Sequence, residues 1–149
     1  MLIVDYKSKS YYRFLNDIPQ ISNHKTRFLI TFNGASEEEL VAASADLTSY
    51  SEEEAQRSTV ITDKASEDKV TALFDSARGN REMLIFESAD VLFDKKTAVK
   101  NSHERDNGFN LNHLFKSIAK HNGIIVLATD RKQILSASMS TKMDVVIRF

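Results

Sequence analysis

Short apolar runs recur along this chain between stretches that mix apolar and charged residues. Apolar runs of this length, bounded by turn residues, are typical of strands buried on both faces of a parallel sheet. Five segments have the pattern: 27–32 (RFLITF), 58–62 (STVIT), 83–86 (MLIF), 124–129 (IIVLAT) and 145–147 (VVI). We therefore expect five central strands.

The stretches between these runs carry apolar residues at helical spacing. Helices are expected over 40–47, from Ser66, over 109–121 and over 132–139. The first is preceded by Ser36 with Glu39 three residues later, which is the spacing of a capping box. Strands that alternate with helices form right-handed crossovers, so the predicted fold is α/β, a three-layer sandwich around a five-stranded parallel sheet.

The first 24 residues fit this alternation less well. The segment 2–4 (LIV) is compatible with a short edge strand, and 10–15 with a short helix that the single proline, Pro19, would end. We expect residues 1–24 to be an N-terminal appendage and residues 25–149 to be the α/β domain.

Composition and charge exclude several classes of function. A chain of 149 residues fits one domain, and its net charge of −1 gives no electrostatic basis for binding nucleic acid or an anionic membrane. It has no cysteine, no basic leader and no apolar run long enough to span a bilayer. We expect a cytoplasmic protein.

Three segments carry a resemblance to a known family. MLIFESADVLFDKK at 83–96 is similar to a Walker B segment, and ASEDKVTALFDSAR at 65–78 to the second helix of the same proteins. The segment 100–130, which ends in LATD, resembles the helix and strand that lead to a sensor-1 residue. The chain from 25 to 149 thus resembles the large nucleotide-binding subdomain of an AAA+ ATPase, nearest to small bacterial members. The resemblance implies the strand order 5-1-4-3-2.

This sequence departs most from the family's pattern at the phosphate-binding loop. Alignment with Walker A puts 32–39 (FNGASEEE) on the loop, with Glu38 at the lysine position and Glu39 at the Ser/Thr position. Three consecutive carboxylates complement the N-terminal end of a helix dipole, but they would repel a triphosphate. We therefore interpret Glu37–Glu39 as helix capping.

The other catalytic positions also differ from the family. The resemblance puts Glu87 in place of the Mg²⁺-binding aspartate, Ser88 in place of the general base and Asp130 in place of the sensor-1 asparagine. Lys142 stands where the family often has paired arginines, and no helical lid follows Phe149. A vestigial nucleotide site is predicted from ten residues: Asn33, Gly34, Ala35, Ser36, Glu37, Glu38, Glu39, Glu87, Ser88 and Asp130.

Other candidate sites are weaker. His103, Glu104 and Asp106 are interpreted as a solvated loop, and His113 and His121 as surface residues, so no metal and no cofactor are expected. Ser88 has neither a neighbouring histidine nor the glycines of a nucleophile elbow, which argues against a hydrolase.

The sequence leads to one main hypothesis and two rivals. The main hypothesis is a catalytically inactive AAA+-like domain that binds a protein: an active AAA+ subunit, a contractile-tail component or another copy of itself. One rival is a nucleotide-binding ATPase with an atypical phosphate loop. The other is an unrelated Rossmann-like domain, for which a flavodoxin-like strand order of 2-1-3-4-5 would be expected.

Overall fold

A computed structural model describes residues 1–24, 27–51, 55–59, 64–77, 83–93 and 111–149. The described strands form one sheet in which every neighbouring pair is parallel, in the order β1-β6-β2-β5-β4-β3. They are β1 (Leu2–Asp5), β2 (Arg27–Asn33), β3 (Ala55–Thr59), β4 (Met83–Glu87), β5 (Gly123–Ala128) and β6 (Val145–Arg148). The last five have the order 5-1-4-3-2 among themselves, which confirms the predicted α/β fold and excludes the flavodoxin-like order. β1 adds a sixth strand at the edge, beyond the five that were predicted.

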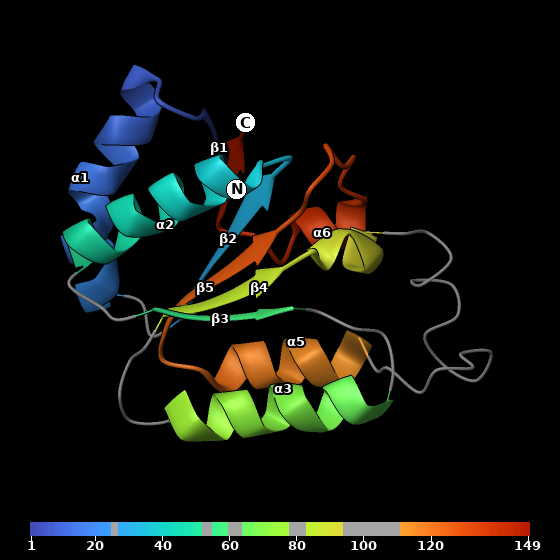
Figure 1. Ribbon diagram of the computed structural model, residues 1–149. Helices are drawn as coiled ribbons and strands as arrows, with labels where there is room; N and C mark the ends of the chain where they lie inside the picture. Colours follow the sequence, from blue (N-terminus) through green and yellow to red (C-terminus); the bar gives the residue numbers. More distant parts are fainter. Residues whose placement is uncertain (25–26, 52–54, 60–63, 78–82, 94–110) are drawn as a thin grey trace.

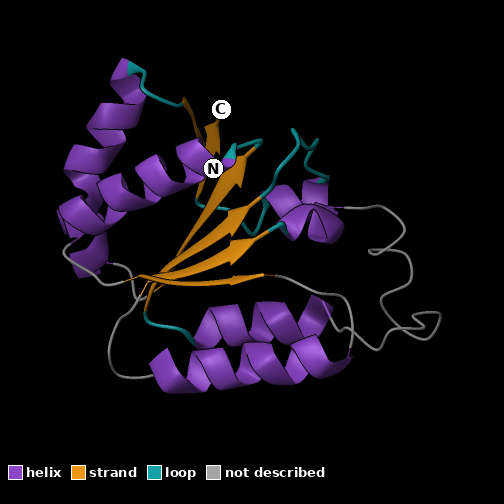
Figure 2. Cartoon of the chain, in the orientation of Figure 1, coloured by secondary structure: helices purple, strands orange, loops and turns teal. Residues whose placement is uncertain are grey.

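Helices cover both faces of the sheet, so the three layers are confirmed (Figure 1). One face carries α1 (Lys9–His24) and α2 (Glu37–Ser51), and the other carries α3 (Lys64–Ala77) and α5 (Leu111–Lys120). Two short helices, the 3₁₀ helix η1 (Ala89–Phe93) and α6 (Ala137–Ser140), lie near the carboxyl ends of the strands (Figure 2).

The central strands owe their position to continuous burial. All six residues of β5 are buried, as are Met83 to Phe86 in β4, because helices cover both faces. Burial of apolar surface stabilises a protein by about 25 cal/mol per Å², so these strands lie at the centre of the sheet.

Residues 1–24 lie in this same sheet and core. β1 pairs with β6, from Leu2 opposite Val145 to Asp5 opposite Arg148, so the expected edge strand at 2–4 is present. Pro19 lies inside α1 and does not end it, contrary to the prediction. The helix continues because Leu15 and Ile18 are buried in the core, which outweighs the lost backbone bond.

Two further boundaries and the burial of one histidine differ from the predictions. β3 lies at Ala55–Thr59, earlier than 58–62, in register with β4; residues 60–63 lie outside the described part of the chain. α6 covers only the end of 132–139, since the preceding residues make hydrogen bonds to other segments. His121 is buried, not at the surface, with its ring edge-on to that of Phe74. No helix in the described ranges is both long and apolar enough to span a membrane.

Candidate functional site

The carboxyl ends of β2, β4 and β5 lie side by side and collect the predicted site residues (Figure 1). Asn33–Glu39 covers the end of β2 and the start of α2. Glu87 and Ser88 stand at the end of β4, and Asp130 follows β5. The ten residues thus come from neighbouring strand ends, at the edge of the sheet where ligands bind in open α/β folds.

The turn after β2 is short and its amides bind the protein itself. β2 ends at Asn33 and α2 begins at Glu37. The Gly34 amide donates to Thr129 Oγ1 at 3.0 Å, and the Ala35 amide donates to the Thr129 carbonyl at 3.0 Å. Thr129 lies directly after β5, so the two strand ends are joined through this residue.

A second connection joins the same two segments. The Asn33 side chain donates to the Gln133 carbonyl at 3.0 Å and accepts from the Gln133 amide at 2.7 Å. Gly34 has φ of +80°, and a Cβ there would lie 2.7 Å from Cγ of Lys132. The loop 129–133 therefore lies in contact with the turn after β2.

The start of α2 is closed by its own side chains. The Ser36 amide donates to Glu39 Oε1 at 2.9 Å, and the Glu39 amide donates to Ser36 Oγ at 3.2 Å. The Leu40 amide donates to the Ser36 carbonyl at 2.8 Å. The predicted capping box is confirmed. The amides of Gly34, Ala35, Ser36, Glu39 and Leu40 thus all donate to acceptors within the protein.

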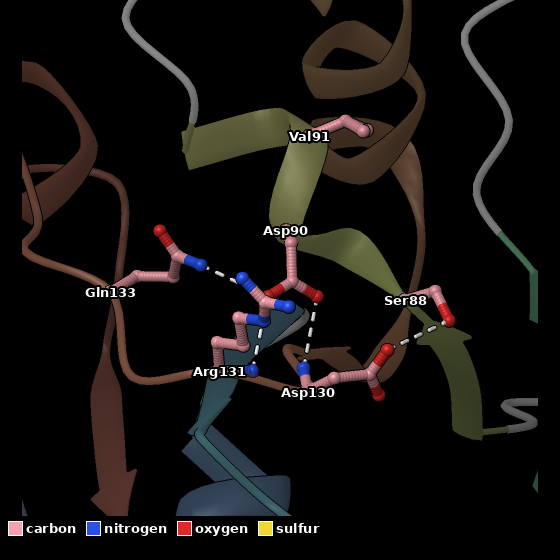
Figure 3. A pocket seen from close by; sticks show the side chains of 6 residues that line it. All are labelled: Ser88, Asp90, Val91, Asp130, Arg131 and Gln133. Atoms are coloured by element: carbon pink, nitrogen blue, oxygen red, sulfur yellow. Dashed lines mark hydrogen bonds between the residues drawn. The ribbon is translucent and has the colours of Figure 1, made fainter.

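Asp90, in η1, organises the other side of the site (Figure 3). Its carboxylate accepts from the amides of Asp130 at 2.9 Å and Arg131 at 3.1 Å. It also accepts from the Gln133 side-chain amide at 2.9 Å. Three donors on one carboxylate fix the loop after β5 against η1.

Ser88 joins the strand end to this arrangement. It has φ of +52°, a left-handed conformation that is uncommon for a residue with a Cβ. Its hydroxyl donates to Asp130 Oδ2 at 3.3 Å, a long hydrogen bond (Figure 3). Two residues at predicted catalytic positions therefore bind each other.

An open cavity of about 560 Å³ lies between η1 and the loop after β5. Its lining residues are Ser88, Asp90, Val91, Asp130, Arg131 and Gln133 (Figure 3). Two carboxylates face one guanidinium, so the charged lining has a negative balance. The cavity follows β4 and β5, whereas the turn after β2 contributes no lining residue.

Three residues that shape the site were not among the ten predicted from the sequence: Asp90, Thr129 and Gln133. Asp90 could have been found from the sequence, because it is an acidic residue between an apolar strand and a second apolar group. Thr129 and Gln133 had none, since their roles depend on contacts with residues about a hundred positions earlier.

Lys142, His113 and His121 do not line the cavity. The Lys142 ammonium lies 5.3 Å from the centre of the Phe115 ring, and His113 shares a hydrogen bond with Thr71. Among the described residues, no three histidine, cysteine or acidic side chains are grouped as metal ligands would be. His103, Glu104 and Asp106 lie outside those residues.

Comparison with known proteins gives similarity in structure alone. No protein-family model and no curated protein matches this sequence. The solved Holliday junction branch migration motor RuvB of Thermotoga maritima superposes with a TM-score of 0.58 at 10% identity, over 95% of this chain and 45% of that one. A katanin structure, described for its self-assembly, superposes with a TM-score of 0.59 at 15% identity, over 94% of this chain and 49% of that one.

The chain has an AAA+ ATPase-like fold. It spans a little under half of each of these solved structures. In this AAA+ ATPase-like fold, β2 is flanked by β6 and β5, and β4 separates β5 from β3, as the resemblance implied. At such low identity the similarity establishes the fold and assigns no activity.

Proposed function

We propose that this chain is an AAA+-like domain that does not hydrolyse ATP and acts as a protein-interaction or structural module. The main support for the proposal is that backbone amides in the turn after β2 already donate hydrogen bonds within the protein. A phosphate-binding loop needs backbone amides that point at the ligand. The amides of Gly34 and Ala35 instead donate to Thr129, and that of Ser36 donates to Glu39.

Charge supports the same proposal. Glu37, Glu38 and Glu39 begin α2, and Asp130 lies at the end of the neighbouring strand β5. Two unit charges of the same sign about 4 Å apart repel by roughly 4 kcal/mol at the effective dielectric of a protein surface. A triphosphate placed at this turn would meet carboxylates where an active site supplies a lysine.

The position of the general base supports it as well. Ser88 follows β4, where the resemblance puts the carboxylate that activates water. A serine hydroxyl cannot serve as that base at neutral pH, and this one donates to Asp130. Glu87 keeps a charge at the preceding position, but its longer arm would misplace a Mg²⁺ ion. We accordingly propose no cofactor and no metal for this domain.

The partner that we propose is a protein. The candidates are an active AAA+ subunit, a contractile-tail component and a second copy of this chain, in a cytoplasmic setting. The katanin structure is described for its self-assembly, which supports assembly as a role for this fold. We further propose residues 25–149 as the AAA+-like unit.

The alternative function is nucleotide binding with an atypical phosphate loop. The similarity to RuvB, described as a motor, favours it. This alternative requires the loop 129–133 to leave the turn after β2, which would break the two hydrogen bonds between Asn33 and Gln133.

A thermal-shift titration with Mg²⁺-ATP and Mg²⁺-ADP separates the two functions. A ligand at about 100 times its Kd stabilises a protein by roughly 2.7 kcal/mol, which raises the melting temperature visibly. We expect no saturable rise with either nucleotide, relative to Mg²⁺ alone. The variant Glu38→Lys restores the lysine but leaves the turn closed, so it too should show no rise. A saturable rise in the unsubstituted protein would establish the alternative.

A further inference from the structure

β1 lies at the edge of the sheet away from β3, yet its sequence is typical of an internal strand (Figure 1). Residues 1–4 form one continuous apolar run, the pattern of a strand that is covered on both faces. Val4 is buried, whereas Leu2 and Ile3 are each 48% exposed. Successive side chains of a strand point to opposite faces, so this edge exposes apolar surface on both of them. Such an edge is a template for pairing with another strand.

The hydrogen bonds of β1 show which of its backbone groups face outward. The amides of Leu2 and Tyr6 donate to carbonyls of the β6 segment at 3.0 Å and 2.8 Å. Because alternate residues of a strand face the same neighbour, the amide and carbonyl of Ile3 and the amide of Asp5 face away from β6. β1 pairs with no other strand in the described part of the chain, so these groups lie at an open edge.

The carbonyl of Asp5 is already occupied, which selects the register of an added strand. It accepts from the Ser8 hydroxyl at 2.6 Å and from the Ser8 amide at 3.1 Å. Ile3 is therefore the residue of β1 whose amide and carbonyl both face outward and are both open to a neighbour. In an antiparallel ladder such a residue pairs with one of the same kind, amide to carbonyl in both directions. A second copy, turned about a two-fold axis, supplies its own Ile3 for this position.

The side chains of β1 fit the same register. Leu2 shares a face with Val4, which belongs to the core under α1, and it would lie opposite Val4 of the second copy. The two Ile3 side chains would meet on the other face. Asp5 would lie opposite Met1 of the second copy, and its carboxylate forms an ion pair of 2.8 Å within its own copy. No two like charges therefore face each other across this pair of strands.

We infer that β1 pairs with β1 of a second copy of this chain, antiparallel and about a two-fold axis, with Ile3 opposite Ile3. The resulting dimer has one continuous sheet, and its symmetry closes the assembly because both copies use the same edge. The inference deepens the proposed function, on which it rests for a protein as the partner. The paired segment is short, so monomer and dimer exchange with protein concentration.

Single-cysteine variants test the register, because the chain has no cysteine of its own. Opposite residues in a hydrogen-bonded antiparallel pair have Cα atoms about 5.5 Å apart, within the range that a disulfide spans. Ile3→Cys should therefore form a covalent dimer under mild oxidation. Leu2→Cys is a matched control, since Leu2 is equally exposed but its two copies would be diagonal neighbours about 7–8 Å apart. It should cross-link much more slowly, and equal rates would overturn the inference.

Sedimentation equilibrium of the whole chain, from micromolar to millimolar concentration, tests the association itself. We expect a monomer–dimer equilibrium. Ile3→Lys places two like charges opposite each other and should weaken the dimer by about tenfold or more. Val41→Lys is the matched control, because it adds the same charge at an apolar position of α2 that is 50% exposed, and it should leave the dimer unchanged.

A second substitution at the same position tests the backbone pairing separately from the side-chain contact. Ile3→Pro removes an N–H that faces away from β6, so it should weaken the dimer without breaking a hydrogen bond between β1 and β6. Ile3 lies outside both parts of the hydrophobic core, so these variants should stay folded, which their melting temperatures verify.

Amide hydrogen exchange in the unsubstituted protein tests the same pairing without any variant. The amides of Ile3 and Asp5 should exchange more slowly as the protein concentration rises, because they become donors to the second copy. Those of Leu2 and Tyr6 already donate to the β6 segment and should change little. Exchange at Ile3 that does not depend on concentration would contradict the pairing.

Three results of the sedimentation series would also overturn the inference. These are a monomer at every concentration, an assembly that grows beyond the dimer, and a dimer that Ile3→Lys leaves unchanged. Thermal-shift titration of Ile3→Lys with Mg²⁺-ATP keeps the two proposals apart. A saturable nucleotide shift would count against the proposed function, whereas absence of the dimer would count only against this inference.

Discussion

At the scale of single residues, Ser36 and Glu39 decide what the start of α2 can do. Each satisfies the other's backbone amide, at 2.9 Å and 3.2 Å, and these amides would otherwise be open to an anion. Glu39, which stands at the Walker A Ser/Thr position, thus has a structural role of its own. Capping accounts for Glu39 without any reference to nucleotide.

Replacing the capping serine should measurably lower stability. We expect Ser36→Ala to reduce the free energy of unfolding by about 1 kcal/mol, the usual cost of removing an N-cap side chain. Ser36→Asp should retain most of the stability, because aspartate caps as well as serine does. Chemical denaturation measures both variants. A loss as large in Ser36→Asp as in Ser36→Ala would argue against the capping role.

Tyr11 should make the stability depend on alkaline pH. It is fully buried and its hydroxyl donates to Asp46 at 2.7 Å, and burial, followed by that carboxylate, raises the Tyr11 pKa well above its ordinary 10.0. The folded protein therefore keeps a proton that the unfolded chain loses above about pH 10. Stability should fall as the pH rises beyond that point.

Tyr11→Phe supplies the control for this prediction. It cannot ionise, so its free energy of unfolding should fall less between neutral pH and about pH 11 than that of the unsubstituted protein. Denaturation curves at the two pH values give the comparison. Identical slopes in the two proteins would show that Tyr11 is not the group responsible.

At the scale of elements, the contact between the loop 129–133 and the turn after β2 is the decisive feature. It joins two segments about a hundred residues apart through Thr129, Gln133 and Lys132. The same loop is held from its other side by Asp90. Closure of the turn is thus a property of two strand ends and η1 together.

Gly34 is the most sensitive position in this contact. Gly34→Ala should destabilise the protein by about 1–3 kcal/mol, since alanine resists a φ of +80° and its Cβ would meet Lys132. The nearest atom is Cγ of the Lys132 side chain, which Lys132→Ala removes. The double variant should therefore recover part of the loss in a double-mutant cycle. Simple additivity would contradict the contact.

Asp90 should control the order of the loop after β5. Asp90→Ala removes an acceptor shared by three donors and leaves the amides of Asp130 and Arg131 unpaired. We expect a loss of about 2–4 kcal/mol and much faster hydrogen exchange at these two amides. Asp90→Asn keeps an acceptor oxygen and should have a smaller effect. Unchanged exchange in Asp90→Ala would contradict the role of this residue.

At the scale of the whole molecule, periodicity along the chain predicted the sheet. Buried runs such as 83–86 and 124–129 identify central strands because nothing but burial on both faces explains them. Boundaries that depend on tertiary contacts were predicted wrongly. Pro19 remains in α1 because its neighbours are buried, and β3 is set by its register with β4.

In the candidate site, too, features that depend on nearby residues were predictable and features that depend on distant residues were not. The turn residues and the capping box were predictable because they lie close together in sequence. The pairing of Asn33 with Gln133 was not predictable, because 100 residues separate them and only the strand order brings them together. The sequence shows Asp90 as an acidic residue after a predicted strand, but it does not predict the three groups that donate hydrogen bonds to it.

The central claim is that the turn after β2 is closed to phosphate, and one measurement tests it most directly. Mg²⁺-ATP is titrated into the protein while the amide signals of Gly34, Ala35 and Ser36 are followed by heteronuclear NMR. Because these amides already donate to Thr129 and Glu39, we predict no saturable change in any of the three. Saturable shifts at these amides would contradict the claim, because the turn would then open to bind the nucleotide.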